Sequence, residues 1–127
     1  QAGVGKGTYA QSTLDAITAK MLGDIEQAGG IITKVYYCTH RKEVGCGCRK
    51  PKPGMFKTAA SEFCINLKNA YFVGDTIRDV LTAQAAGCKS ILVLTGKEKL
   101  ANQKNWELKP DYVFKDLLEA AKFLIKN

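Results

Sequence analysis

Residues 70–94 read AYFVGDTIRDVLTAQAAGCKSILVL and carry the clearest structural pattern in the chain. A short apolar run over 70–73 predicts a buried strand, and a second over 90–94 predicts another. Between them, residues 77–86 have the composition of a helix, which Gly87 ends. A strand, a crossover helix and a second strand form a βαβ unit, so this stretch predicts a parallel sheet.

The rest of the chain continues the alternation of helices and strands. We expect Ser12 to cap a helix that Gly29 and Gly30 end, and Pro53 to take the first helical position before a helix over 55–63. Further elements are predicted as a strand over 31–37, a polar loop over 96–110, an edge strand over 112–114 and a helix over 117–125. The fold class is therefore α/β, a Rossmann-like parallel sheet flanked by helices, and residues 1–127 are expected to form a single domain.

Residues 1–7 form a glycine-rich stretch for which we expect a loop. No strand precedes it and the chain lacks an initiator methionine. We therefore expect the sequence to start inside a domain.

Composition narrows the class of protein. The 127 residues are 46% hydrophobic and 24% charged, which is ordinary for a globular protein with one core. No apolar run approaches the roughly 18 residues of a membrane span and no signal peptide opens the chain, so we expect no membrane partner and a cytoplasmic location. The net charge of +7 favours anionic partners such as nucleic acid, nucleotides or phosphorylated metabolites, although scattered lysines also serve solubility.

Three of the five cysteines crowd around the single histidine in the pattern C-x-H-x5-C-x-C. Zinc is held by four nitrogen and sulfur ligands in structural sites, and a cluster this dense in a basic loop favours metal over disulfides. We predict a structural Zn²⁺ in a zinc loop over residues 38–48. The remaining cysteines, Cys64 and Cys88, have apolar neighbours and are expected to be small core residues. The four predicted zinc ligands are Cys38, His40, Cys46 and Cys48.

Two further segments suggest phosphate chemistry. Residues 49–55, RKPKPGM, hold three cations in a segment stiffened by two prolines, although composition alone favours a solvated run of charges there; residues 74–79 read GDTIRD. Asp75 follows a predicted strand directly, at the edge of a parallel sheet where ligands bind, and carboxylate oxygens there suit Mg²⁺. Asp79 is equally explained as a helix N-terminal residue that complements the helix dipole.

Taken together, the order of the glycine-rich stretch, C-x-H, C-x-C-R-K-P-K-P-G-M and G-D-x-x-x-D resembles the heptose bisphosphate phosphatases of the haloacid dehalogenase superfamily. The resemblance spans nearly the whole chain, and its block over 46–55 is the most specific part. It implies removal of a phosphate, expected at C7, from D-glycero-D-manno-heptose 1,7-bisphosphate in lipopolysaccharide precursor synthesis. It also implies an aspartyl-phosphate intermediate and the cofactors Mg²⁺ and Zn²⁺.

The resemblance implies a role for each matching residue. Lys50 matches a lysine that steadies the transferring phosphoryl group, and Asp75 matches a catalytic Mg²⁺ ligand. Arg49 matches a substrate-recognising arginine. Gln1 and Ala2 fall in a substrate-contacting turn, where Ala2 departs from the family's serine. Thr76 stands where relatives often carry a substrate-binding lysine.

The family's nucleophile and general acid are two aspartates in a D-x-D-G-T motif, and no such motif occurs in these residues. We expect that motif upstream of Gln1, so residues 1–127 should lack the nucleophile segment.

Other interpretations remain open at this point. The related histidinol-phosphate phosphatases share the zinc loop, the R-K-P-K block and the G-D motif. A basic zinc module that binds nucleic acid would also fit the charge. The sequence GVGKGT over 3–8 echoes the phosphate loop of adenylate kinases but lacks a preceding strand. We favour a monomeric phosphatase that acts on a phosphorylated sugar and binds no nucleic acid.

Overall fold

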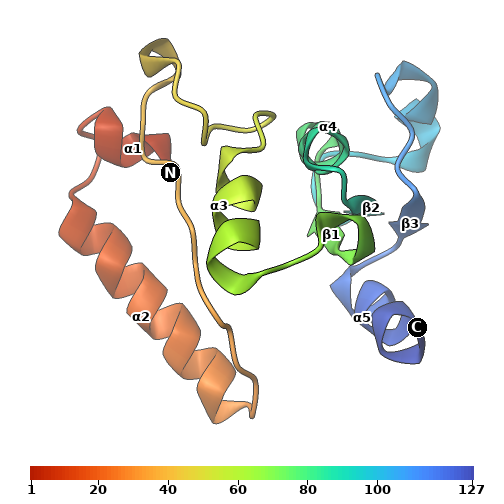
Figure 1. Ribbon diagram of the computed structural model, residues 1–127, viewed down its shortest axis with the longest axis horizontal. Helices are drawn as coiled ribbons and strands as arrows, with labels where there is room; N and C mark the ends of the chain where they lie inside the picture. Colours follow the sequence, from red (N-terminus) through yellow and green to blue (C-terminus); the bar gives the residue numbers. More distant parts are fainter. The chain divides into compact units, whose positions relative to one another are not determined.

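The computed structural model describes all residues, 1–127, and the chain forms two compact units, residues 1–49 and 50–127. Figure 1 shows the helices and strands of both units, and each unit is described here by itself. That residues 1–127 form one domain stays a prediction.

The first unit is built around one long helix, α2 (Gln11–Gln27). The helix was predicted, but Ala10 occupies the N-cap position and Ser12 lies inside the first turn, so the predicted cap is wrong. The Gln11 side chain instead donates to the Asp15 carboxylate at 2.9 Å, an i,i+4 contact that stabilises the first turn. At the other end Gly29 adopts a φ of 86°, which confirms the predicted glycine stop.

Two expectations for the first unit are wrong. The predicted loop over residues 1–7 contains a helical turn, α1 (Ala2–Gly5), whose Gly5 N–H donates to the Thr39 carbonyl at 3.0 Å. The predicted strand over 31–37 is not a strand, because the only sheet consists of β1, β2 and β3. Its β-branched and aromatic residues favour extended backbone, but a strand also needs a neighbouring strand to complete its hydrogen bonds.

The second unit contains the sheet that the sequence predicted. Strands β1 (Tyr71–Gly74), β2 (Lys89–Val93) and β3 (Tyr112–Phe114) are parallel, in the order β1-β2-β3. The helices are α3 (Gly54–Phe63), α4 (Ile77–Ala86) and α5 (Leu117–Lys126), with short 3-10 helices η2 (Leu67–Asn69) and η3 (Leu100–Asn105); η1 (Lys42–Val44) lies in the first unit. Pro53 is the N-cap of α3 and not its first helical residue, so that prediction misses by one position.

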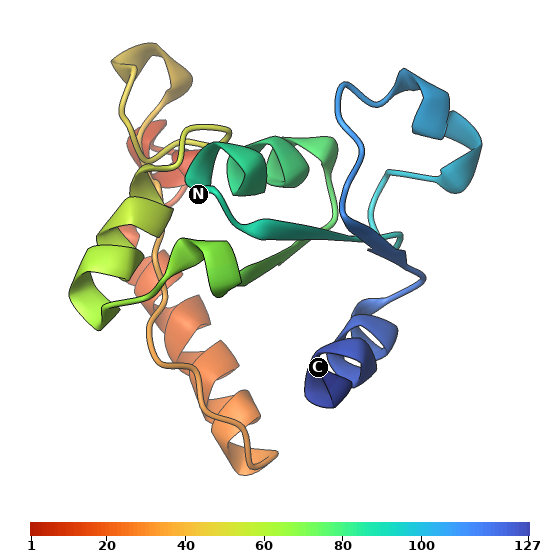
Figure 2. The same ribbon diagram turned by 45° about the vertical axis from the view of Figure 1, so that its right-hand side comes forward.

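The core of this unit lies on both faces of the sheet. Figure 2 shows α4 and α5 on opposite faces. On one face Ile91 and Val93 pack with Ala120, and a ring of aromatic and aliphatic side chains surrounds them. Burying an aliphatic side chain of this size contributes about 1.5–3 kcal/mol, so these contacts fix α5 against the sheet. The surrounding side chains are Tyr71, Val73, Tyr112, Phe114, Phe123 and Leu124.

The two isolated cysteines differ from the expectation of core residues. Cys64 is exposed and ends α3 in the left-handed region, with a φ of 54°, so the prediction is wrong for Cys64. The chain leaves the helix at this position. Cys88 is half-buried, and its burial raises the pKa of the thiol.

None of the helices combines the length and apolar character that crossing a membrane requires.

Candidate phosphate pocket and metal cluster

The end of β1 leads straight into the candidate site. Asp75 follows the strand, and Thr76 caps α4 with its hydroxyl, which accepts from the Asp79 N–H at 3.2 Å. In return the Asp79 carboxylate accepts from the backbone N–H groups of Thr76 at 3.1 Å and Asp75 at 3.2 Å. This capping box fixes the turn that carries Asp75. The interpretation of Asp79 as a helix N-terminal residue is therefore confirmed.

Gly74 allows this turn to close. A Cβ atom at Gly74 would lie 2.3 Å from the Cβ of Asp79 and 2.6 Å from its carboxylate. Since side-chain atoms do not approach so closely, only glycine fits beneath the buried Asp79 side chain. The glycine before the site aspartate thus has a packing role that the sequence pattern alone did not reveal.

Asp79 also binds Lys50, the lysine that the resemblance assigns to the transferring phosphoryl group. The Lys50 ammonium donates to the Asp79 carboxylate at 2.5 Å, and the Asp79 side chain is only 5% exposed. Burial acts to raise the pKa of Asp79, but the hydrogen bonds from Lys50 and Thr76 outweigh it and hold the pKa below its usual value. Asp79 therefore stays ionised and keeps Lys50 in place. Sequence reasoning missed this pair, because nothing in the pattern links two positions so far apart.

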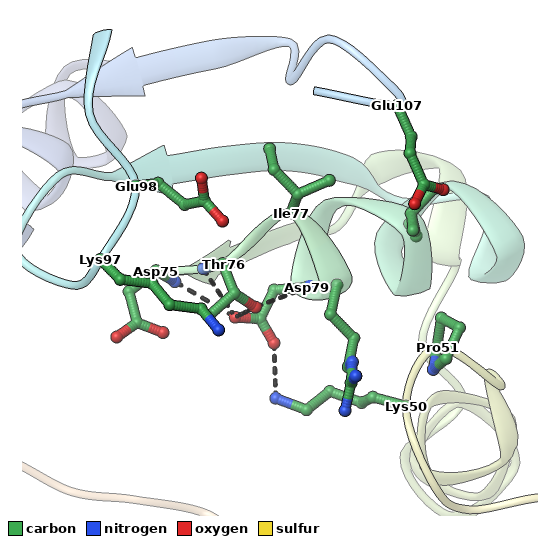
Figure 3. A pocket seen from close by; sticks show the side chains of 11 residues that line it. Lys50, Pro51, Asp75, Thr76, Ile77, Asp79, Lys97, Glu98 and Glu107 are labelled. Carbon is green, nitrogen blue, oxygen red and sulfur yellow. Dashed lines mark hydrogen bonds and ion pairs between the residues drawn. The ribbon is translucent and has the colours of Figure 1, made fainter. Parts of the chain in front are cut away.

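Lys50 and Asp75 line one pocket of about 670 Å³, formed entirely by residues of the second unit (Figure 3). The structure thus brings together two predicted site residues. It adds residues that the sequence analysis did not select, from α4 and from the segment after β2. The added lining residues are Ile77, Arg78, Leu81, Lys97, Glu98 and Glu107, and Pro51, Thr76 and Asp79 from the segments already discussed complete the lining. Only a general preference for charged groups at the carboxyl edge of a sheet could have suggested the charged residues among those added.

The segment after β2 lies directly against Asp75. A Cβ atom at Gly96 would lie 2.7 Å from the Asp75 carboxylate, so this position also requires close backbone approach. The Asp75 carboxylate is exposed and takes part in no hydrogen bond or ion pair. A free carboxylate at the carboxyl edge of a parallel sheet, with further acidic groups in the same pocket, is a donor set that Mg²⁺ accepts.

The other predicted substrate-contacting residues lie in the first unit. Gln1 accepts a hydrogen bond from the Tyr9 hydroxyl at its side-chain oxygen, and Ala2 opens α1. Arg49 ends this unit. Their roles in substrate contact stay predictions.

The four predicted zinc ligands meet in the first unit. Their ligand atoms all lie within 4.8 Å of one another. The Cys38 sulfur lies 3.4 Å from that of Cys46 and 3.0 Å from that of Cys48, and the His40 Nδ1 atom lies 3.2 Å from Cys48. Tetrahedral zinc with Zn–S bonds of about 2.3 Å separates its sulfurs by about 3.8 Å. The three sulfurs thus lie slightly closer together than in such a cage, and small movements would bring them to that spacing.

The thiols of the cluster influence one another's ionisation. Partial burial acts to raise the pKa of Cys46, but hydrogen bonds from Cys38 and Cys48 and from the Arg49 backbone lower it to about 6. Hydrogen bonding with Cys38, burial and the nearby Cys46 raise the pKa of Cys48 to about 12. Several thiolates packed together repel one another, whereas a divalent cation would neutralise them.

A known protein family matches the part of the sequence that forms this pocket. The sequence profile of the HAD-hydrolase-like family matches residues 47–120, which include the Lys50–Asp79 pair and every residue that lines the pocket. The chain belongs to this family of hydrolases.

More specific relatives are phosphatases. The chain is 37% identical to D-glycero-beta-D-manno-heptose-1,7-bisphosphate 7-phosphatase of Pseudomonas putida, over 98% of this chain and 71% of the relative. It is 36% identical to the enzyme of the same name from Neisseria meningitidis, over 100% of this chain and 69% of the relative.

A solved structure supports the same conclusion. The D,D-heptose 1,7-bisphosphate phosphatase of B. bronchiseptica, complexed with magnesium and phosphate, is 34% identical and superposes with a TM-score of 0.87. The match covers 99% of this chain and 70% of that one. The predicted haloacid dehalogenase-like α/β fold and the predicted class of phosphatase are therefore confirmed.

Proposed function

We propose that this chain binds the substrate phosphate and Mg²⁺ in a phosphatase that removes the C7 phosphate of D-glycero-D-manno-heptose 1,7-bisphosphate. The observation that carries the proposal is the joint position of Lys50 and Asp75 in one pocket. The names of the relatives support the substrate, and the magnesium and phosphate in the B. bronchiseptica enzyme support the cofactor.

In this proposal, Asp75 holds Mg²⁺ through its free carboxylate. The ion, when bound, withdraws charge from phosphoryl oxygens. The backbone packs closely at Gly74, which precedes Asp75, and at Gly96, which lies against its carboxylate. This packing limits the movement of the turn that carries the Asp75 carboxylate.

Lys50 contributes the fixed positive charge. Because the Asp79 carboxylate is buried and ionised, it holds the Lys50 ammonium beside it and limits its rotation. The other N–H groups of the Lys50 ammonium can donate to phosphoryl oxygens, whose negative charge changes while the phosphoryl group is transferred. The pair therefore positions a donor before substrate arrives, which avoids reorganisation during the reaction.

The identity of the attacking group stays a prediction. The resemblance implies an aspartyl-phosphate formed on a D-x-D-G-T motif, expected upstream of Gln1. The curated relatives are longer, since the chain spans about 70% of their length.

We further propose that Cys38, His40, Cys46 and Cys48 hold a structural Zn²⁺. Four nitrogen and sulfur donors, all within 4.8 Å of one another, would fill a tetrahedral zinc and leave no ligand position for substrate, and such closed sites are structural. The ion would cross-link the two ends of the loop over 38–48. The first unit contains no strand that could hold this loop by backbone hydrogen bonds.

We also propose that the protein is a monomer, which analytical ultracentrifugation tests. The cytoplasmic location stays a prediction.

The test of function is release of inorganic phosphate from the heptose 1,7-bisphosphate, in both anomers, by the natural protein with and without Mg²⁺. Histidinol phosphate is the competing substrate, and residues 1–127 alone are assayed in parallel. We expect Mg²⁺-dependent release from the heptose bisphosphate to exceed release from histidinol phosphate by orders of magnitude. A preference for histidinol phosphate, or tight salt-sensitive binding of nucleic acid without hydrolysis, would contradict the proposal.

A further inference from the structure

Lys97 is a cation of the pocket that no protein group neutralises. It lies in the segment after β2 and lines the same pocket as Lys50 and Asp75. Its ammonium makes no hydrogen bond or ion pair, whereas Lys50 is paired with Asp79. In Figure 3 the Lys97 side chain points toward the part of the pocket where Asp75, Thr76 and Asp79 lie, and Lys50 reaches it from another side.

The backbone that carries Lys97 is held in place. The preceding residue, Gly96, approaches the Asp75 carboxylate so closely that a Cβ atom would lie 2.7 Å from it. The Gly96 carbonyl accepts from the Lys99 ammonium at 3.2 Å, and the Lys99 N–H donates to the Asn102 side chain at 2.9 Å, at the start of η3. The position of Lys97 next to Asp75 therefore follows from the packing of its loop.

The charges of the pocket leave a place for an anion beside Lys97. Asp79 compensates Lys50, and Glu98 accepts from the indole N–H of Trp106 at 3.1 Å. Asp75 is the carboxylate assigned to Mg²⁺. Thr76 has no charge, and its hydroxyl is engaged in the cap of α4. A phosphate held at Asp75 would gain from a second cation on this side, because a dianion is poorly balanced by a lysine that is already paired.

We propose that Lys97 is a substrate-binding residue that donates to the phosphate group held beside Asp75, on the side away from Lys50. The ligand class is a phosphate monoester or inorganic phosphate, bound together with Mg²⁺. This inference rests on the proposed function of the pocket and adds a contact that the motif over 49–55 does not supply. Arg78, also in the pocket, lies on α4 and is not part of the assignment.

The test measures inorganic phosphate binding to the natural protein with saturating Mg²⁺, by ³¹P NMR titration. Lys97→Met should weaken phosphate binding about tenfold, which is the loss expected for one hydrogen bond to a charged group. Lys97→Arg should retain most of the affinity. Lys104→Met is the matched control, because Lys104 is exposed on the same segment and does not line this pocket. Mg²⁺ binding without phosphate should be unchanged in Lys97→Met, and circular dichroism verifies its fold.

The outcomes separate this inference from the proposed function. Unchanged phosphate affinity in Lys97→Met, with affinity lost in Lys50→Met, overturns the role of Lys97 and leaves the phosphate pocket intact. Equal losses in Lys97→Met and Lys104→Met also overturn it, because they would report only net charge. If neither Lys97→Met nor Lys50→Met alters binding, both the role of Lys97 and the proposed pocket are wrong.

Discussion

The Lys50 ammonium lies 2.5 Å from the Asp79 carboxylate and joins the basic segment before α3 to the first turn of α4. Asp79 at the same time accepts from the Thr76 hydroxyl and from two backbone N–H groups of the turn that holds Asp75. One buried carboxylate therefore orients both the proposed phosphate-binding cation and the proposed Mg²⁺ ligand. Its contribution to stability and its contribution to function can be separated experimentally.

Replacing Asp79 should destabilise the fold. Asp79→Ala removes an ion pair and the carboxylate half of the α4 capping box, and we expect unfolding free energy to fall by about 2 kcal/mol, less than for a fully buried pair because Lys50 is 39% exposed. Lys50→Met should cost less, since Asp79 keeps its bonds to Thr76. Urea unfolding of both variants measures the difference. Equal stability of wild type and Asp79→Ala would show that this carboxylate does not organise the turn.

Gly74 should tolerate no side chain. In Gly74→Ala the new methyl group would lie 2.3 Å from the Cβ of Asp79, so we expect a loss of more than about 2 kcal/mol in unfolding free energy, or loss of folding. Gly23→Ala is the matched control, because it lies inside α2 with nothing within 4 Å of its Cβ position. That control should be neutral or stabilising by up to about 1 kcal/mol. Thermal melting curves of the two variants give the comparison, and equal melting temperatures would contradict the packing argument.

Sequence reasoning succeeded where local signals determine the structure. Helix α4 was predicted with its observed bounds, because its residues have helical composition and Gly87 marks its end. The strand over 31–37 was predicted wrongly, because propensity describes a residue's preference and not the presence of a partner strand. The ion pair of Lys50 with Asp79 and the approach of Gly96 to Asp75 could not be predicted. Both depend on how distant segments cross at the edge of the sheet.

The cluster at residues 38–48 should bind one zinc ion per chain. Cys46→Ser should lower the zinc content measured by mass spectrometry, and it should lower the melting temperature, since a structural metal contributes to folding free energy. Cys64→Ser is the matched control, because Cys64 is exposed and outside the cluster. A chelator should mimic Cys46→Ser in the wild type and have no further effect on the variant. Purified protein that lacks zinc and melts at the same temperature after chelation would exclude a structural site.

Kinetics of the natural protein should separate the two neighbouring cations of the basic segment. Lys50→Ala should lower kcat by about 10²–10³-fold, because its ammonium faces charge that changes on the phosphoryl group in the transition state. Arg49→Ala should mainly raise KM. The resemblance gives Arg49 a role in substrate recognition, and such a contact is equally strong in the ground state and in the transition state. Lys57→Ala, an exposed lysine of α3 that does not line the pocket, is the control for lost charge. Steady-state phosphate release at saturating Mg²⁺ yields both constants for each variant. Wild-type kcat in Lys50→Ala would mean that the ion pair with Asp79 only supports the fold, and the phosphate site would have to be sought among the other cations of the pocket.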